Sequence, residues 1–146
     1  MPGPQAVRVG LEIGPRWVFA SALDWPGWCR RGKGEQAALD VLLDYADRYA
    51  AVAGSGFGPG DLRVVGQVPG NKITDFGAPD VQGPWDSEAL PADEADRLTR
   101  LLEACWGYLD PVAAAAPEAL RRIRYRAGHA PPGAPARSAA ASAARC

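Results

Sequence analysis

Apolar and polar residues alternate along residues 7–13 in the order Val-Arg-Val-Gly-Leu-Glu-Ile. A period of two is typical of a β-strand with one buried face. The turn formers Gly14 and Pro15 come next, and residues 17–23 then form a second run that is rich in aromatic and small side chains. The two runs together predict a β-hairpin.

The second run ends at Asp24-Trp25-Pro26-Gly27. Proline cannot donate a hydrogen bond to a sheet, and glycine tolerates unusual backbone angles, so this segment predicts a turn. Residues 28–31 then predict a short third strand that returns along the hairpin. A further strand is expected at residues 62–68, before Pro69-Gly70-Asn71.

Two segments repeat apolar residues at helical spacing and predict amphipathic helices. In residues 35–53 the apolar positions are Leu39, Leu42, Leu43, Ala46, Tyr49, Ala50 and Ala53. In residues 91–109 they are Leu98, Leu101, Leu102, Cys105 and Leu109, and Pro111 is expected to interrupt this helix. Residues 71–90 are rich in turn formers and are expected to form a long loop.

These elements predict an α+β fold with a small antiparallel sheet of about three to four strands, packed by the 35–53 helix. We divide the chain into a hairpin, helix and strand unit at 1–70 and a loop with a helical extension at 71–120. Residues 121–146 are rich in Ala, Pro and Arg and are expected to be a disordered tail.

The net charge of −1 conceals an asymmetry, because residues 1–120 carry −7 and residues 121–146 carry +6. The acidic part makes nucleic acid an unfavourable partner. No run approaches the roughly 18 apolar residues of a membrane span, and no signal peptide is recognisable. Three widely spaced cysteines predict no disulfide framework, so we expect a cytoplasmic protein without a membrane.

Catalytic machinery is hard to find in this sequence. The single histidine, His129, lies in the expected tail, so no imidazole is available to the expected domain, and we expect no metal and no cofactor. Cys29 precedes two arginines and could have a lowered pKa, although a packed cysteine is the favoured interpretation. Phe76 is expected in the core, and the alternative is a ligand-facing loop that carries Thr74 and Asp75.

Five tryptophans are many for 146 residues. Trp17, Trp25 and Trp28 cluster near the Pro-Gly turn. We expect Trp17 and Trp106 in the core and at least one of Trp25 and Trp28 on the surface, where a rigid aromatic ring suits recognition.

The run Asp24-Trp25-Pro26-Gly27-Trp28-Cys29-Arg30-Arg31-Gly32, followed by Glu35-Gln36-Ala37-Ala38-Leu39, resembles the HicB-like antitoxin domain. The resemblance covers about residues 7–53, with 62–68 as a later strand. It implies a small hairpin-plus-helix sheet, often dimeric, that binds a toxin ribonuclease and, through an appended domain, operator DNA. No ribbon-helix-helix or helix-turn-helix pattern follows in this chain.

Residues 17–120 also resemble a family of uncharacterised bacterial proteins that share the turn at residues 23–30 and the Thr-Asp-Phe-Gly-Ala-Pro segment at residues 74–79. Those proteins continue as a helical region where this chain becomes rich in Ala, Pro and Arg. Residues 121–146 are therefore either a native tail or the product of a truncation or frameshift.

The leading hypothesis is a non-enzymatic HicB-like module that recognises a basic protein partner, or a second copy of itself, through the turn at residues 25–31. The alternative is a small enzyme or small-molecule-binding domain with a pocket between that turn and residues 74–79. The candidate binding residues are Trp25, Pro26, Gly27, Trp28, Arg30, Arg31, Thr74, Asp75 and Phe76.

Overall fold

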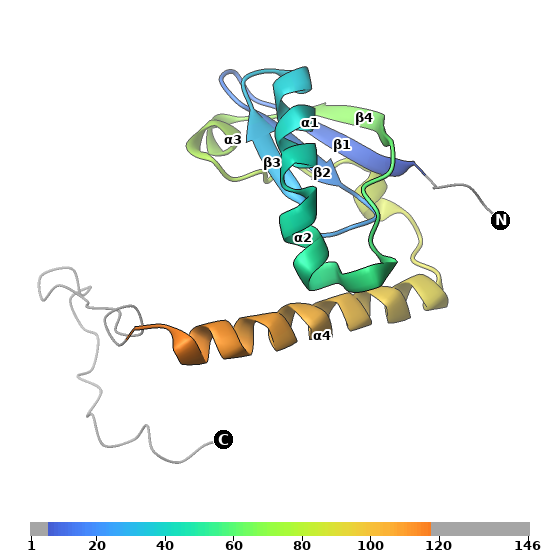
Figure 1. Ribbon diagram of the computed structural model, residues 1–146. Helices are drawn as coiled ribbons and strands as arrows, with labels where there is room; N and C mark the ends of the chain where they lie inside the picture. Colours follow the sequence, from blue (N-terminus) through green and yellow to red (C-terminus); the bar gives the residue numbers. More distant parts are fainter. Residues whose placement is uncertain (1–5, 118–146) are drawn as a thin grey trace, which may run out of the picture. The chain divides into compact units, whose positions relative to one another are not determined.

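The computed structural model describes residues 6–117, and their fold is α+β, as the sequence predicted. Four strands form one sheet in the order β3-β2-β1-β4 (Figure 1). The strands are β1 (Val7–Ile13), β2 (Val18–Ala22), β3 (Cys29–Gly32) and β4 (Leu62–Pro69). The first three are antiparallel neighbours, but β4 lies parallel to β1. The sheet is therefore mixed rather than antiparallel, because helices connect β3 to β4 and return the chain in the direction of β1.

One face of the sheet is covered by α1 (Glu35–Asp44), which continues after Tyr45 into α2 (Ala46–Ala53) (Figure 1). The core between them contains Val9, Leu11, Ala20, Trp28, Ala38 and Leu42. The predicted 35–53 helix thus exists and packs on the sheet, with a break at Tyr45. Gly32 permits the close approach, because a Cβ there would lie 2.3 Å from the backbone nitrogen of Ala38.

The opposite face of the sheet is also covered in part, so β1 is not the half-buried strand that its alternation predicted. The indole of Trp85 lies on Gly10 and Gly66, where an added Cβ would approach the ring to 2.6 Å and 2.9 Å. A register shift in β4 leaves Val65 without a partner on β1 and places Gly66 opposite Gly10. Two glycines on neighbouring strands therefore make a flat site for one ring.

The segment expected as a long loop contains two short helices, α3 (Lys72–Phe76) and the 3₁₀ turn η2 (Pro84–Ser87). Asn71 begins α3 with a capping box, since its side chain accepts hydrogen bonds from the backbone of Ile73 and Thr74. Few apolar positions fall at helical spacing in so short a helix, so its sequence pattern is weak.

The last described helix is α4 (Ala92–Ala115), which contains Pro111 rather than ending at it. Among the described residues, those up to Asp110 form one compact unit, and those from Pro111 onward belong to a second. Within α4 only Leu101 is buried. The expectation that Trp106 belongs to the core is wrong, because 60% of this residue is exposed.

No helix among residues 6–117 is long and apolar enough to cross a membrane. The expected disordered tail at residues 121–146 lies outside the described residues.

Candidate functional site

The turn that joins β2 to β3 has a well-defined geometry. Gly27 has a φ of 92°, a left-handed conformation that strains other residues, and the backbone N–H of Trp28 donates to the carbonyl of Trp25 at 3.1 Å. The hydroxyl of Tyr49 on α2 donates to the carbonyl of Pro26 at 2.9 Å. The turn is thus held to α2, with Pro26 and Gly27 exposed.

The two tryptophans of this turn have different environments. Trp28 is 1% exposed, and its Nε1–H donates to the carbonyl of Leu42 at 2.8 Å. A residue buried in this way cannot contact a partner at the surface, so its place is structural. Trp25 is half-buried and packs against the core with one part of its ring still accessible.

Four aromatic rings pack together behind the turn and fix the orientation of Trp25. The ring centroid of Phe57 lies 5.1 Å from that of Trp25 and 5.0 Å from that of Trp28, both in edge-on contact. Tyr49 stacks on Trp28 with 6.0 Å between centroids. These separations and angles are those that aromatic quadrupoles favour.

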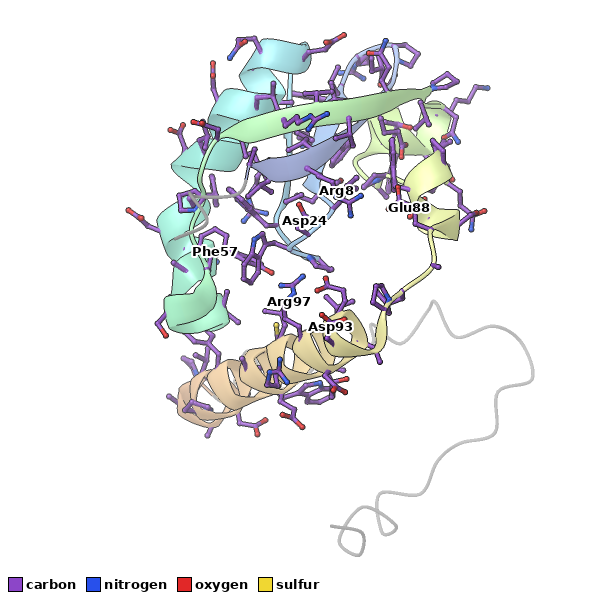
Figure 2. The ribbon with its side chains drawn as sticks, turned by 90° about the vertical axis from the view of Figure 1, so that its right-hand side faces the viewer. Arg8, Asp24, Phe57, Glu88, Asp93 and Arg97 are labelled. Atoms are coloured by element: carbon purple, nitrogen blue, oxygen red, sulfur yellow. The ribbon has the colours of Figure 1, made fainter. Side chains whose placement is uncertain are left out.

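An open cleft of about 970 Å³ lies between this turn, the loop at residues 56–60 and the beginning of α4. Arg8, Asp24, Trp25, Trp85, Glu88 and Arg97 are among its lining residues. Figure 2 shows Arg97 pointing from α4 toward Asp24, with Phe57 on one side and Arg8 and Glu88 on the other. Trp25 is the only candidate binding residue from the sequence that lines this cleft.

Arg97 joins α4 to the turn through several contacts. Its guanidinium lies 4.6 Å from the centroid of the Trp25 ring, and Nη2 donates to the backbone carbonyl of Asp24. The same guanidinium donates to both carboxylate oxygens of Glu94, at 2.7 Å from Nε and 2.5 Å from Nη2. These hydrogen bonds lower the pKa of Glu94 and raise that of Arg97, so both groups stay charged.

One nitrogen of Arg97 is different. Nη1 is buried, and no acceptor within residues 6–117 lies within hydrogen-bond distance of it. A buried donor without a partner costs about 1–3 kcal/mol. Because this nitrogen is buried, an acceptor in the cleft would reach it only if the Arg97 side chain moved.

Arg8 forms the second charged centre of the cleft. Its Nε donates to Asp24 at 2.9 Å, and its Nη1 donates to Glu88 at 2.9 Å. The hydrogen bond that Arg8 donates to Glu88 is the main cause of the raised pKa of Arg8. Both pairs are partly exposed to solvent, so each contributes little to stability.

Acidic groups outnumber basic ones along the cleft. Its carboxylates are those of Asp24, Asp86, Glu88, Asp93 and Glu94, against the guanidinium groups of Arg8 and Arg97. The lining therefore carries a formal charge of −3. A negative cleft with aromatic walls attracts cations through both charge and the faces of the rings.

The two candidate arginines of β3 already contact aromatic rings. The guanidinium of Arg30 lies 4.2 Å from the ring centroid of Tyr45, and that of Arg31 lies 4.5 Å from the ring centroid of Trp17, which is half-buried rather than part of the core. Burial raises the pKa of the neighbouring Cys29 thiol, which agrees with a packed cysteine and not with a reactive thiolate.

The second group of candidate residues lies at the other end of the sheet. Thr74 is fully buried, and its hydroxyl donates to Glu12 at 2.5 Å. The carboxylate of Asp75 accepts from the backbone of Arg16 and Trp17, at the turn between β1 and β2.

Phe76 is 87% exposed, so its expected place in the core is wrong. It ends α3, a single short helix, and its ring extends into solvent. Since β1 is roughly 20 Å long, one pocket between Trp25 and residues 74–79 would have to span the length of the sheet.

The sequence did not indicate three residues that line the cleft, namely Glu88, Asp93 and Arg97, nor Phe57, which packs against Trp25. Each is an ordinary loop or helix-surface residue in its local pattern. Their role depends on contacts across the chain, such as the ion pair between Arg8 and Glu88. The net negative charge of residues 1–120 was the one signal that pointed toward an acidic site.

Among residues 6–117, no three His, Cys, Asp or Glu side chains are grouped so that they could hold a metal ion. The expectations of no metal and no cofactor stay predictions. No family model, curated protein or solved structure matches this chain, so the resemblance to HicB-like domains likewise stays a prediction.

Proposed function

We propose that this protein is a non-enzymatic binding module whose cleft beside Trp25 binds a basic segment of a partner protein. The observation that carries the proposal is the combination of an acidic lining with the half-buried ring of Trp25, which already holds the guanidinium of Arg97 on one face. The exposed residues Pro26 and Gly27 extend the binding surface from the edge of the cleft, whereas Trp28 supports the turn from within the core.

Arg97 illustrates how such a segment would be held. One guanidinium is stacked on Trp25, donates to the backbone carbonyl of Asp24 and is paired with Glu94. An arginine or lysine of a partner could pair with the exposed carboxylate of Asp93, and could share Glu88, which is exposed and already accepts from Arg8. Cation–π contacts of this kind contribute about 0.5–1 kcal/mol at exposed sites and more where water is excluded.

Nη1 of Arg97 is the one buried side-chain nitrogen or oxygen among residues 6–117 that has no hydrogen-bond partner. A peptide carbonyl is a suitable acceptor for it if the Arg97 side chain moves to expose it. The net charge of −7 on residues 1–120 would in addition speed the encounter with a basic partner, and this contribution falls with added salt. The resemblance to HicB-like domains implies a toxin ribonuclease as the partner, which the proposal accommodates if that toxin presents a basic segment.

The proposal is tested with a synthetic nine-residue peptide of alternating Arg and Ala, titrated calorimetrically at low salt. Asp93→Asn should weaken binding by roughly 2–5-fold, because one exposed ion pair is lost. Asp47→Asn on α2 removes the same charge away from the cleft and serves as the matched control. Equal losses for the two variants would show only a general charge effect and would refute the cleft.

Trp25→Ala tests the aromatic wall. We expect a further loss of binding of roughly 3–10-fold, with a thermal midpoint measured in parallel because Trp25 also packs against the core. Full-strength binding by a folded Trp25→Ala protein would exclude the stacking contact.

A small cationic molecule is the second candidate, because 970 Å³ falls within the size range of ligand sites. Arginine amide separates the two candidates. If it binds as tightly as the nine-residue peptide, the cleft recognises a single cationic group and not a peptide segment.

A further inference from the structure

The described part of α4 has an apolar stripe that nothing in residues 6–117 covers. Leu102 is 58% exposed, Trp106 60% and Leu109 54%. Leu98 lies one turn before them and is half-buried. Isolated apolar residues are common on protein surfaces, but four that follow one side of a helix form a continuous patch.

The stripe differs from the side of α4 that faces its own domain. Arg97 lies on that side, since it contacts Trp25 (Figure 2). Leu101 is buried and lies on the same side. Leu102, Trp106 and Leu109 project from the helix roughly 80–140° away from Leu101, at 100° per residue. Leu98 lies nearer to Leu101, at about 60°, and also lines the cleft. Another chain could therefore reach Leu102, Trp106 and Leu109 without displacing α4 from the cleft, and would meet Leu98 at the edge of the cleft.

The spacing within the stripe points to another helix as the occupant. Leu98, Leu102, Cys105 and Leu109 follow one another at intervals of four, three and four residues. This is the 3.5-residue repeat of a coiled-coil seam. Trp106 and Tyr108 flank the seam. In many coiled coils these flanking positions carry charged residues that determine which chain binds.

We propose that the stripe of α4 pairs with the same stripe of a second copy, as an antiparallel helix pair. The spacing of the seam residues is the same in both directions along the helix. When Leu98 faces Leu109 of the other copy, Leu102 faces Cys105, so every seam residue meets an apolar partner. One patch that complements itself is the condition for a two-fold symmetric interface.

Charge favours the antiparallel arrangement. The first turns of α4 contain Asp93, Glu94 and Asp96, and a parallel pair would place these carboxylates beside the same three of the other copy. The antiparallel pair separates the acidic turns and sets the helix dipoles in opposite directions. No charged residue occupies the seam itself.

The size of the stripe sets the strength of the pair. Its exposed side chains would remove on the order of 500 Å² per copy from water, less than the about 800 Å² of a standard stable interface. We therefore expect a reversible dimer with a dissociation constant in the micromolar range, which forms as concentration rises from roughly 1 to 200 µM.

Sedimentation of the full chain over that range tests the pairing. Leu102→Glu and Trp106→Glu should each raise the dissociation constant by at least about 10-fold, because a carboxylate would be buried in the seam at position 102 or against its edge at position 106. Gly107→Glu adds the same charge on the opposite side of α4, where an added Cβ meets no atom within 4 Å, and should leave the dimer unchanged. A monomer at every concentration, or an equal effect of all three variants, overturns the proposal.

The direction of the helices is tested by disulfide formation in a Cys29→Ser, Cys146→Ser background. Adding Leu102→Cys should produce a covalent dimer under mild oxidation, because the new thiol would face Cys105 of the other copy. The background protein, with Cys105 alone, should cross-link far more slowly. If the background protein cross-links as fast as the Leu102→Cys variant, the antiparallel register is wrong.

Discussion

The helices α1 and α4 have similar sequence patterns and opposite surroundings. Both repeat apolar residues at helical spacing, yet α1 buries Ala38 and Leu42 completely, while α4 buries only Leu101. Small residues allow α1 to approach the sheet, above all Gly32 beneath it. On α4 the apolar stripe turns away from the domain. Amphipathic spacing thus identifies the apolar side of a helix, but it does not say what covers that side.

The largest difference between the two regions should appear when Trp28, which packs beneath α1, and Trp106, which lies on α4, are removed in turn. Trp28→Ala deletes a buried ring and its hydrogen bond to Leu42, and should lower the free energy of unfolding by about 3–5 kcal/mol. Trp106→Ala removes an exposed ring and should change it by less than about 0.5 kcal/mol. Urea unfolding at low protein concentration measures both. Similar losses would mean that α4 is packed as tightly as α1.

Neighbouring leucines within α1 sharpen the same comparison inside one helix. Leu42→Ala should cost about 2–5 kcal/mol, because Leu42 faces the sheet with none of its surface exposed. Leu43 lies on the outer side of α1 and is largely exposed, so Leu43→Ala should cost less than about 1 kcal/mol. If the two costs were reversed, the helix would be rotated on the sheet.

Much of this arrangement could be predicted from the sequence, because the signals were local. The alternation in β1 and the helical period of residues 35–53 depend on neighbours a few positions apart. Pro26 and Gly27 marked the turn through their own backbone restrictions. These elements lie where they were predicted, with a break at Tyr45 in the helix.

What the sequence could not indicate depends on distant contacts. The parallel pairing of β4 follows from the path of the chain through α1 and α2, and the ring of Trp85 on Gly10 and Gly66 joins segments far apart. The cleft unites Arg8, Asp24 and Arg97 from three elements, and none of them has a distinctive local pattern. The proposed binding site is therefore a product of tertiary structure.

A smaller loss of stability is expected from a substitution on the other face of the sheet, where Thr74 donates to the buried carboxylate of Glu12. Thr74→Val keeps the shape but removes one donor to Glu12 and the acceptor of the Asn71 backbone N–H. It should cost about 1–3 kcal/mol because both partners lose a hydrogen bond inside the protein. Thr99→Val on α4 is the matched control, since the exposed hydroxyl of Thr99 bonds only to the carbonyl of Ala95 in its own helix. A Thr74→Val cost no greater than that of the control would show that water replaces the missing donor.

The smallest expected effect is a change of the free energy of unfolding at alkaline pH, which arises from Tyr49 in the aromatic cluster beside the cleft. Burial is the main cause that raises the pKa of Tyr49 from 10.0 to about 12. Because the folded protein keeps this proton to higher pH than the unfolded chain, the shift stabilises the folded state. This stabilisation is fully present below pH 10 and is lost as pH rises from 10 to 12.

Tyr49→Phe removes the ionisable group together with the hydrogen bond to Pro26. We expect the variant to be less stable than the parent at pH 8, by about 0.5–1.5 kcal/mol for the lost hydrogen bond, and the gap to narrow as the parent loses stability above pH 10. Urea unfolding of both proteins at several pH values measures this gap. If the gap stays constant through pH 12, Tyr49 ionises equally in the folded and unfolded states, and its ring is more accessible than its packing against Trp28 and Phe57 implies.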